Sequence, residues 1–482
     1  MSSSMRFAVF NPATGEQIGS ALDGGADEAR AAIGAAYAAF PAWAASGAYE
    51  RAAKLYRAYE LMLSKRDELA RLMTAEQGKP LKMAHAEVKY AADFLLWFAE
   101  EAKRVYGETI PSARVDQRFL VRREPVGVVC AITPWNYPVS MITRKVAPAL
   151  AAGCTIVLKP AETTPLCALA VFNILEEAGV PRGVANLVTA ANPAPVGEVF
   201  CTDPRVRKIS FTGSTEVGRK LYQWAAAQFK RVSLELGGHA PFIVFDDADP
   251  VHAAKGAAAV KFLNTGQACI SPNRIFVQRS IAGPFLETLQ KRVMAQRVGN
   301  GMDETSTVGP LFSQRALDKV DLQVQDAIAR GAKLLAGGKR LVDGDLVRGF
   351  FYAPTLLSEV TADMRIYREE TFGPVAPVIV FDTEQEVLAM ANDTGYGLAS
   401  YVYTQNLSRA MRMFEGLQFG IVGINDINPT SAAAPFGGIK DSGLGREGAR
   451  QGQDEHLAGS LDRLESPVPV RQASSPSRLA NE

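Results

Sequence analysis

Cys269 is the residue of this 482-residue chain whose setting best suits covalent chemistry. It ends the segment NTGQAC, residues 264–269, between a predicted helix and a predicted strand, where a loop can present a side chain on a rigid base. A thiol reacts as its thiolate, and the pKa of a free cysteine is about 8.5, so catalysis requires an activating partner. The alternative interpretation is an inert loop cysteine.

The other four cysteines have no neighbours that suggest chemistry. Cys130 and Cys154 lie in apolar segments and are expected in the core, and Cys167 and Cys201 also lack chemical partners. Because the cysteines are odd in number and unpatterned, they exclude a disulfide scaffold. Only four histidines occur, none at a metal-ligand spacing, so no metal site is predicted.

Glu235 is the candidate general base. It lies near the end of a predicted strand, residues 232–236, directly before Gly237 and Gly238. A lone carboxylate among apolar residues has a raised pKa, which suits a base working near neutral pH. A carboxylate satisfied by backbone N–H groups is the alternative. Sequence spacing does not show whether Glu235 and Cys269 meet.

A phosphate site is predicted at Gly213 and Ser214. A strand ends at Phe211, and a helix follows the turn with Val217 and Leu221 on one face. The free N–H groups and the dipole at such a helix N-terminus favour an anion, although an ordinary capped helix has the same pattern.

A GxGxxG pattern also occurs, at Gly443, Gly445 and Gly448. The dinucleotide-binding fingerprint requires a strand immediately before it, whereas the nearest predicted strand ends near Asn425. We therefore interpret this segment as a flexible loop.

These residues require a scaffold of parallel strands. Apolar runs alternate with helical segments, and the predicted strands are residues 126–132, 155–158, 186–188, 207–211 and 232–236. Thr164 is expected to cap one intervening helix, which Pro165 starts and Gly179 ends. A second block of strands and helices follows to about Asn425. This alternation predicts an α/β fold whose parallel sheets are covered on both faces.

The charge balance of the chain disfavours nucleic acid and membranes as binding partners. With 52 Lys+Arg against 51 Asp+Glu, the chain lacks the basic surface typical of nucleic-acid or membrane binding. The longest apolar run, residues 146–158, is too short to span a bilayer, and the N-terminus lacks a signal-peptide core. We expect a cytoplasmic protein without nucleic acid or membrane. The Ser- and Pro-rich residues 466–482 are expected to be disordered.

Over residues 7–456 the chain resembles the aldehyde dehydrogenase superfamily. The resemblance rests on seven motifs in order: PWNYP at 134–138, KPAE at 159–162, FTGS at 211–214, ELGG at 235–238, NTGQAC at 264–269, ETFGPV at 370–375 and PFGG at 435–438.

The resemblance implies a reaction. Cys269 would attack an aldehyde carbon, while the Asn136 amide and the Cys269 backbone N–H hold the oxyanion. After oxidation of this adduct to a thioester, water activated by Glu235 would release a carboxylic acid. A carboxylate at Glu162 near the ribose 2′ position favours NAD, and Lys159 leaves NADP open. The implied cofactor residues are Thr133, Trp135, Asn136, Lys159, Glu162, Gly213, Ser214, Leu236, Glu370 and Phe372.

Residues 141–145 look most like those of succinate-semialdehyde dehydrogenases. The likeness implies that Arg144 contacts a distal carboxylate of the substrate, and a surface or interface ion pair is the alternative for Arg144. That group usually carries a second arginine where this chain has Leu263, and some members have a second cysteine where it has Ser271. A semialdehyde is therefore expected, with a broad-range aliphatic or aromatic aldehyde as the alternative. The implied substrate residues are Arg144, Tyr137, Leu263, Ile270 and Ser431.

The resemblance also implies three parts. These are a Rossmann-like cofactor domain (1–106 and 126–236), a catalytic domain (237–440) and a small β bridging unit (107–125 and 441–465) that would form a homodimer or homotetramer. Residues 456–461 have poor strand propensity, which puts the last strand in doubt.

Three other function classes stay open. One is acyl transfer to coenzyme A, which Glu235 disfavours because that reaction needs no base for water. The others are a catalytically silent protein on the same fold and a cysteine hydrolase in which His239 serves as the base.

Overall fold

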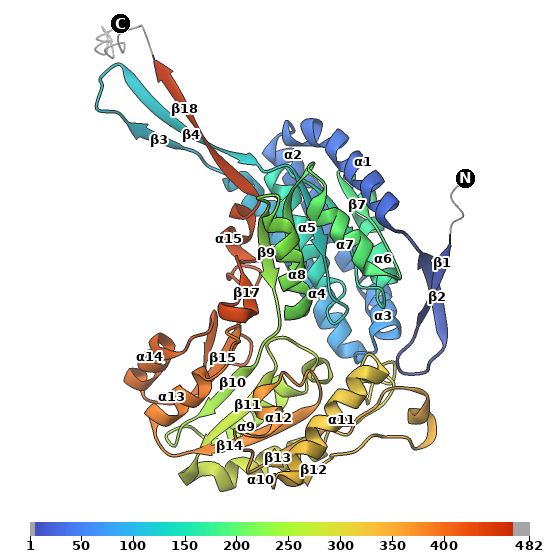
Figure 1. The fold of residues 1–482 in the computed structure, drawn as a ribbon, viewed down its shortest axis with the longest axis vertical. Helices are drawn as coiled ribbons and strands as arrows, with labels where there is room; N and C mark the ends of the chain where they lie inside the picture. Colours follow the sequence, from blue (N-terminus) through green and yellow to red (C-terminus); the bar gives the residue numbers. More distant parts are fainter. Residues whose placement is uncertain (1–4, 466–482) are drawn as a thin grey trace, which may run out of the picture.

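Two largely parallel sheets form the body of the protein. The computed structural model describes residues 5–465, so the expected disorder of residues 466–482 lies outside the described residues. Figure 1 shows a six-stranded half above a seven-stranded half, with a three-stranded arm projecting from the body. The predicted α/β class is confirmed. Among the described residues, no helix is long and apolar enough to cross a membrane.

The six-stranded sheet has the order β17-β9-β8-β5-β6-β7. Strands β5 to β9 are parallel, and each begins within two residues of its prediction, whereas β17 joins the edge antiparallel to β9. The strands are β5 Val128–Ile132, β6 Thr155–Lys159, β7 Ala185–Leu187, β8 Val206–Thr212, β9 Arg231–Glu235 and β17 Gly443–Leu444.

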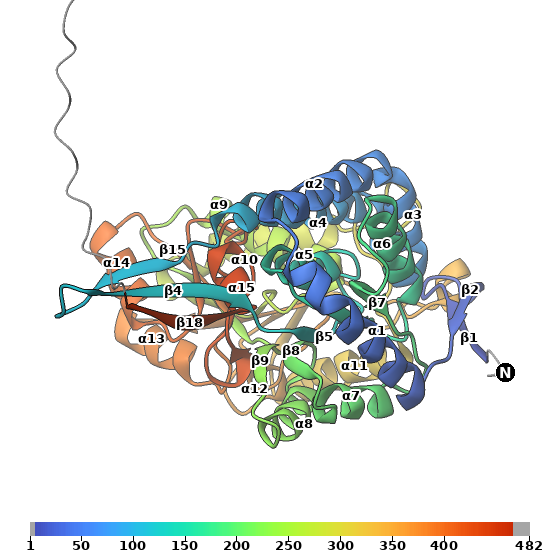
Figure 2. The ribbon, with the colours of Figure 1, turned by 90° about the horizontal axis from the view of Figure 1, so that it is seen from above.

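Alternating side chains bury both faces of this sheet. In β5, Val129 and Ala131 belong to the core formed with α2, α4, α5 and α6, whereas Val128 and Cys130 pack in the core formed with α1, α7 and α8. The helices are α1 Ala26–Ala44, α2 Ala48–Ser64, α3 Arg66–Gln77, α4 Leu81–Glu101, α5 Ser140–Ala152, α6 Pro165–Glu177, α7 Pro193–Thr202, α8 Thr215–Ala226 and α15 Ala449–Asp454. Figure 2 shows them from above.

Thr164 occupies the N-cap position of α6 as predicted, but its side chain does not cap the helix. The Thr164 hydroxyl makes no capping bond, and Glu76 at the end of α3 accepts hydrogen bonds from the backbone N–H of Leu166 (2.6 Å) and Cys167 (2.8 Å) instead. A carboxylate is a stronger acceptor than a hydroxyl and also benefits from the helix dipole, so a residue from a neighbouring helix displaces the local cap.

The seven-stranded sheet has the order β12-β13-β14-β11-β10-β15-β16. Alternation again fills two cores, since Phe242 and Ile243 of β10 face opposite sides. Its strands are β10 Ala240–Val244, β11 Pro272–Gln278, β12 Lys333–Ala336, β13 Thr355–Ser358, β14 Val375–Phe381, β15 Ala399–Tyr403 and β16 Ile421–Ile424. Its helices are α9 Pro250–Lys261, α10 Ala282–Met294, α11 Gln314–Ala329, α12 Arg365–Arg368, α13 Glu384–Asn392 and α14 Leu407–Gly416.

The doubted C-terminal strand is present. The projecting arm consists of β3 Glu108–Pro111, β4 Gln117–Pro125 and β18 Leu457–Glu465 (Figure 1), and β18 pairs with β4 over nine residues from Leu457↔Pro125 to Glu465↔Gln117. A continuous ladder of this length overrides weak intrinsic propensity. At the other end of the chain, β1 Arg6–Phe10 and β2 Gln17–Leu22 form a separate hairpin.

The glycine-rich segment is not the flexible loop that we expected. Gly443 and Leu444 pair with Glu235 and Leu234, and Gly443 has a φ of 142°. A Cβ there would collide with the carbonyl of Leu234, so glycine permits this close approach. The pattern thus closes the edge of the sheet beside Glu235 and does not precede a dinucleotide-binding helix.

Candidate active site

Polar residues gather at the carboxyl ends of the six-stranded sheet. The strand order β7-β6-β5-β8-β9 reverses its direction between β5 and β8, and open α/β sheets bind ligands in the crevice at such a point. Thr133 follows β5 and Thr212 ends β8, and both hydroxyls are buried without a hydrogen-bond partner in the described part of the chain. These donors fit a polar ligand such as a dinucleotide.

Helix α8 begins directly beside this crevice. Ser214 is its N-cap, and the Ser214 hydroxyl accepts a hydrogen bond from Val217 N at 3.4 Å. Only part of the predicted apolar face is buried, because Leu221 is covered whereas Val217 is 46% exposed. The first turn of α8 therefore offers N–H groups to an anion and an apolar side chain to a ring beside it.

Lys159 and Glu162 lie at the end of the neighbouring strand β6. The buried Lys159 ammonium is 3.3 Å from Glu162 Oε2 and donates to Pro160 O at 2.9 Å. Burial lowers the pKa of Lys159, and the Glu162 carboxylate opposes that shift. Glu162 itself is exposed, so its carboxylate is available to a ribose hydroxyl.

Glu370 precedes β14 and contacts the connection between the two sheets at Gly238. Its Oε1 accepts a hydrogen bond from Gly238 N at 2.9 Å, and burial raises the pKa of this carboxyl group. A Cβ at Gly237 would lie 3.2 Å from Glu370 Oε2, and a Cβ at Gly238 would collide with the carbonyl of Cys269. The glycine pair therefore lets the end of β9, the nucleophile loop and Glu370 pack together. Buried Leu236 lies between this pair and β9.

Cys269 is held by a strained loop. Residues Leu263–Gly266 form a 3-10 turn in which Asn264 and Thr265 have positive φ values of 49° and 61°. Non-glycine residues in this region are costly and persist only where surrounding structure holds them, typically at functional sites. Cys269 is half-buried and leads into β11.

Glu235 acts electrostatically on Cys269, an interaction that sequence spacing could not show. Burial raises the pKa of the Cys269 thiol to about 12, Arg144 lowers it and Glu235 raises it further. Neither oxygen of the buried Glu235 carboxylate has a hydrogen-bond partner within residues 5–465. The backbone-satisfied alternative for Glu235 is therefore wrong. Burial first, and then Glu447, raise the pKa of Glu235 well above its usual value.

Asn136 lies against the nucleophile loop. Its Nδ2 donates to Gln267 O at 3.0 Å, which leaves the second amide hydrogen for another acceptor. The backbone carbonyl of Asn136 accepts from Asn264 Nδ2 at 2.8 Å and from Lys79 Nζ at 2.8 Å. This arrangement fixes an amide donor beside Cys269.

Lys79 and Glu87 hold the Asn136 segment, and sequence reasoning missed both. They form a buried ion pair, and Glu87 Oε1 accepts from the backbone N–H of Val139 (3.0 Å) and Ser140 (3.1 Å). No local signal in the sequence identifies such a pair. Lys145 and Glu447, which form a second buried pair beside Glu235, were missed for the same reason.

Arg144 is buried, so the surface or interface ion pair is wrong. Its Nη2 donates to the Tyr90 hydroxyl at 2.7 Å, and its guanidinium lies 4.2 Å from the centroid of the Phe436 ring. Nε and Nη1 have no hydrogen-bond partner among residues 5–465, because Glu447 Oε2 is 3.9 Å from Nη1. Two unused donors of one guanidinium in a buried, aromatic setting can bind a carboxylate.

The remaining predicted substrate residues differ in their surroundings. Tyr137, Leu263 and Ile270 are half-buried, and the Lys79 ammonium lies 4.1 Å from the centroid of the Tyr137 ring. Ser431 is exposed in the loop before Phe436, and its hydroxyl accepts from Ala433 N at 3.2 Å. Tyr137, Leu263 and Ile270 therefore adjoin the Asn136 and Cys269 segments, whereas Ser431 lies at a solvent-exposed position.

His239 does not serve Cys269 as a base. Its Nε2 lies 2.7 Å from the carbonyl of Tyr367, and burial lowers its pKa to about 3. The cysteine-hydrolase alternative therefore loses the partner that it requires.

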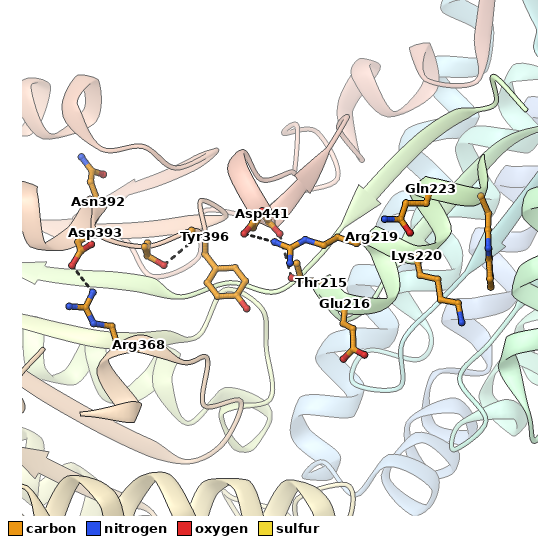
Figure 3. A pocket seen from close by; sticks show the side chains of 13 residues that line it. Thr215, Glu216, Arg219, Lys220, Gln223, Arg368, Asn392, Asp393, Tyr396 and Asp441 are labelled. Carbon is orange, nitrogen blue, oxygen red and sulfur yellow. Dashed lines mark hydrogen bonds and ion pairs between the residues drawn. The ribbon is translucent and has the colours of Figure 1, made fainter. Parts of the chain in front are cut away.

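A cavity lies between α8 and the segment from Arg368 to Tyr396 (Figure 3). Its volume is about 1140 Å³, and four of its charged side chains form two ion pairs, Arg219 with Asp441 and Arg368 with Asp393, each at 2.7 Å. Thr215 and Tyr396, which both line it, also flank Gly237. The cavity therefore adjoins the Glu370 region and does not replace the Cys269 site.

The thiol of Cys269 is expected to react faster as pH rises. The thiolate is the reactive form, and a pKa near 12 means that its fraction grows about tenfold per pH unit below that value. We expect iodoacetamide alkylation of Cys269, measured by peptide mass spectrometry, to increase from pH 6.5 to 9.5 without a plateau. A plateau below pH 8 would show that the thiol is activated in the free protein.

Comparison with known proteins places these residues in context. The model of the "Aldehyde dehydrogenase family" matches residues 1–458. The chain is 52% identical over 449 residues to succinate-semialdehyde dehydrogenase [NADP(+)] of Escherichia coli, covering 93% of this chain and 92% of that protein. It is equally similar, with the same coverage, to glutarate-semialdehyde dehydrogenase of Pseudomonas putida. A crystal structure of an E. coli NADP-dependent enzyme superposes with a TM-score of 0.94 at 50% identity, covering 96% of both chains.

Proposed function

The chain belongs to the aldehyde dehydrogenase family, and we propose that it oxidises a carboxylate-bearing semialdehyde, such as succinate or glutarate semialdehyde, with NAD or NADP. The observation that carries the substrate class is Arg144, a buried guanidinium with two unused donors beside the Cys269 and Glu235 pair. A buried cation that keeps free donors is costly unless an anion arrives to use them.

The nucleophilic step begins at Cys269. Once the Cys269 thiol has lost its proton to solvent, the sulfur adds to the aldehyde carbon, and the carbonyl oxygen becomes the oxyanion of a thiohemiacetal. The second amide hydrogen of Asn136 and the Cys269 N–H stabilise that charge, and Arg144 holds the distal carboxylate so that the carbon stays in reach. A bound nicotinamide dinucleotide supplies the two-electron acceptor for the oxidation to a thioester.

Glu235 completes the cycle. Its carboxylate removes a proton from water as the water oxygen attacks the thioester carbonyl, and the carbon–sulfur bond then breaks to release the acid and the Cys269 sulfur. The raised pKa of Glu235 makes it a stronger base when it is ionised. A base for water also favours this reaction over acyl transfer to coenzyme A, and a silent protein would have no use for an unpartnered buried carboxylate.

The dinucleotide is held by residues of the six-stranded sheet in this proposal. Ser214 and Trp135 meet the pyrophosphate, Lys159 and Glu162 the adenosine ribose, and Glu370 with Phe372 the other ribose. Glu162 is exposed and charged, so it accepts a 2′-hydroxyl but repels a 2′-phosphate, which favours NAD over NADP. The projecting three-stranded arm, with its open edges, is the surface through which we propose that a homodimer or homotetramer forms.

Arg144→Gln tests the substrate class. The charged hydrogen bonds to be lost are worth about 1.5–3 kcal/mol, so kcat/KM for succinate semialdehyde should fall about 10- to 100-fold relative to butanal. The ratio of the two substrates isolates the carboxylate contact, because Arg144 also lowers the pKa of Cys269 and so affects both. Formation of NADH or NADPH is followed at 340 nm with each dinucleotide.

Tyr90→Phe provides the matched control for this experiment. It removes the hydroxyl that accepts from Arg144 Nη2 but keeps the guanidinium, so the substrate ratio should change less than about threefold. An unchanged ratio in Arg144→Gln would contradict the carboxylate clamp. Equal use of butanal and semialdehyde by the unaltered enzyme would favour the broad-range alternative, with Leu263 shaping the pocket.

A further inference from the structure

The Trp135 ring packs against two phenylalanines of the seven-stranded half. The Phe312 ring is stacked on it, with centroids 3.9 Å apart and planes 22° apart. The Phe372 ring meets it edge-on at 5.8 Å and 82°. Phe312 comes just before α11, and Trp135 follows β5. The stack therefore joins the two halves of the molecule beside the proposed dinucleotide crevice.

The backbone around Phe312 is bonded to the nucleophile loop. Phe312 N donates to Gln267 Oε1 at 3.1 Å, and Gln267 Nε2 donates to Pro310 O at 3.2 Å. One turn earlier, Gly309 N donates to the Thr265 hydroxyl at 3.0 Å. Residues 309–312 are therefore bonded to the loop that carries Cys269 at three points.

These contacts close into a ring. From Phe312 the hydrogen bonds lead to Gln267, whose carbonyl accepts from Asn136 Nδ2 at 3.0 Å, and Asn136 directly follows Trp135. Gln267 and Asn136 are 1% and 6% exposed, so water does not readily replace either bond. Trp135 is therefore connected to Gln267, two positions before the nucleophile, by two paths. One runs through the Phe312 ring and the other through Asn136.

We propose that Phe312 is a positioning residue that couples dinucleotide binding at Trp135 to the orientation of the Cys269 loop. The inference rests on the proposed function, because only a dinucleotide-dependent enzyme places a ligand against Trp135. Coupling of this kind requires that the ligand favour one arrangement of the stack over another. Without the Phe312 ring the hydrogen bonds of Gln267 remain, but the direct ring contact with Trp135 is lost and only the chain connection through Asn136 is left.

The test measures alkylation of Cys269 by iodoacetamide with and without saturating NAD, in the absence of aldehyde. NAD should change the rate at least about fivefold in the unaltered enzyme, within the usual range of allosteric coupling. Phe312→Leu should reduce the change to less than about twofold, whereas Phe312→Tyr, which keeps a ring to stack, should restore it.

Phe350→Leu is the matched control. Phe350 and Phe312 line the same cavity of about 390 Å³, but in the described part of the chain the ring of Phe350 makes no stacking contact with Trp135. Its alkylation ratio should equal that of the unaltered enzyme. Quenching of tryptophan fluorescence gives the Kd of NAD for each variant, so that every ratio is measured at saturation.

Three results would overturn the coupling. The first is a Phe312→Leu enzyme that keeps the full alkylation ratio at saturating NAD. The second is a Phe312→Leu enzyme whose only change is a weaker affinity for NAD. The third is an unaltered enzyme whose alkylation does not respond to NAD. The second would make Phe312 a simple cofactor contact. Failure of the proposed function is distinct, because the enzyme would then show the NAD-dependent alkylation ratio and still form no NADH from any aldehyde.

Discussion

Cys269→Ala is expected to lower kcat for aldehyde oxidation by about 10⁵-fold or more, the order of loss seen when a covalent nucleophile is removed. An aldehyde carbonyl cannot readily lose a hydride, whereas the oxyanion of a thiohemiacetal can expel one. Asn136 and Arg144 would still hold the aldehyde, but neither can add to its carbon. Absorbance at 340 nm with purified protein, NAD and succinate semialdehyde measures the loss.

A second variant separates the loss of chemistry from the loss of structure. Cys201→Ala removes a thiol that is buried in the core between α1, α7 and α8, and we expect at least half of the activity to remain. Cys269→Ala should still bind NAD, as fluorescence would show, because the proposed dinucleotide residues are intact. Residual activity above about 1% would point to a different nucleophile, since losses of that size are too small for covalent catalysis.

The strands of the six-stranded sheet could be predicted because burial on both faces leaves a local signature. Each of the five predicted strands is present, and Thr133, Lys159 and Thr212 lie at carboxyl ends of these strands, where open α/β sheets bind ligands. Cys269 does not follow that rule, because it precedes β11 and therefore lies at the amino end of a strand. Its loop setting made it a candidate, and its resemblance to a known motif implied its role.

Contacts between distant segments explain what the sequence could not predict. Glu76 caps α6 from 90 residues away, and Glu87 holds the backbone of Val139 and Ser140 across 52 and 53 residues. Neither carboxylate has a local pattern that distinguishes it from a solvated one. The stack of Phe312 on Trp135 likewise depends on how the two sheets meet, and periodicity within either half says nothing of that.

The C-terminal strand shows the opposite case, in which local propensity misled. Gly459 and its neighbours favour a loop by composition, yet the ladder with β4 forms through backbone groups that every residue carries. The pairing partner lies more than 330 residues earlier in the chain, so its contribution is absent from any local window.

Glu235→Gln is expected to stop the reaction at the thioester. Its steady-state kcat should fall about 10²- to 10⁴-fold, the usual contribution of a general base. Rapid mixing should still show a burst of one NADH per active site, because thioester formation needs Cys269 and Asn136 and not Glu235. In the unaltered enzyme kcat should rise with pH as Glu235 ionises, because burial and Glu447 raise its pKa and so move that ionisation to higher pH. In the variant that rise should disappear.

Hydroxylamine distinguishes a lost base from a damaged site. Its nitrogen attacks a thioester without a base, giving a hydroxamate and freeing the Cys269 sulfur, so it should restore turnover in Glu235→Gln. The glutamine amide is nearly isosteric with the carboxyl group, so the substitution leaves no cavity. It also removes the charge that raises the pKa of Cys269. Loss of the burst together with the steady state would mean that Glu235 acts before the thioester, on the Cys269 thiol itself.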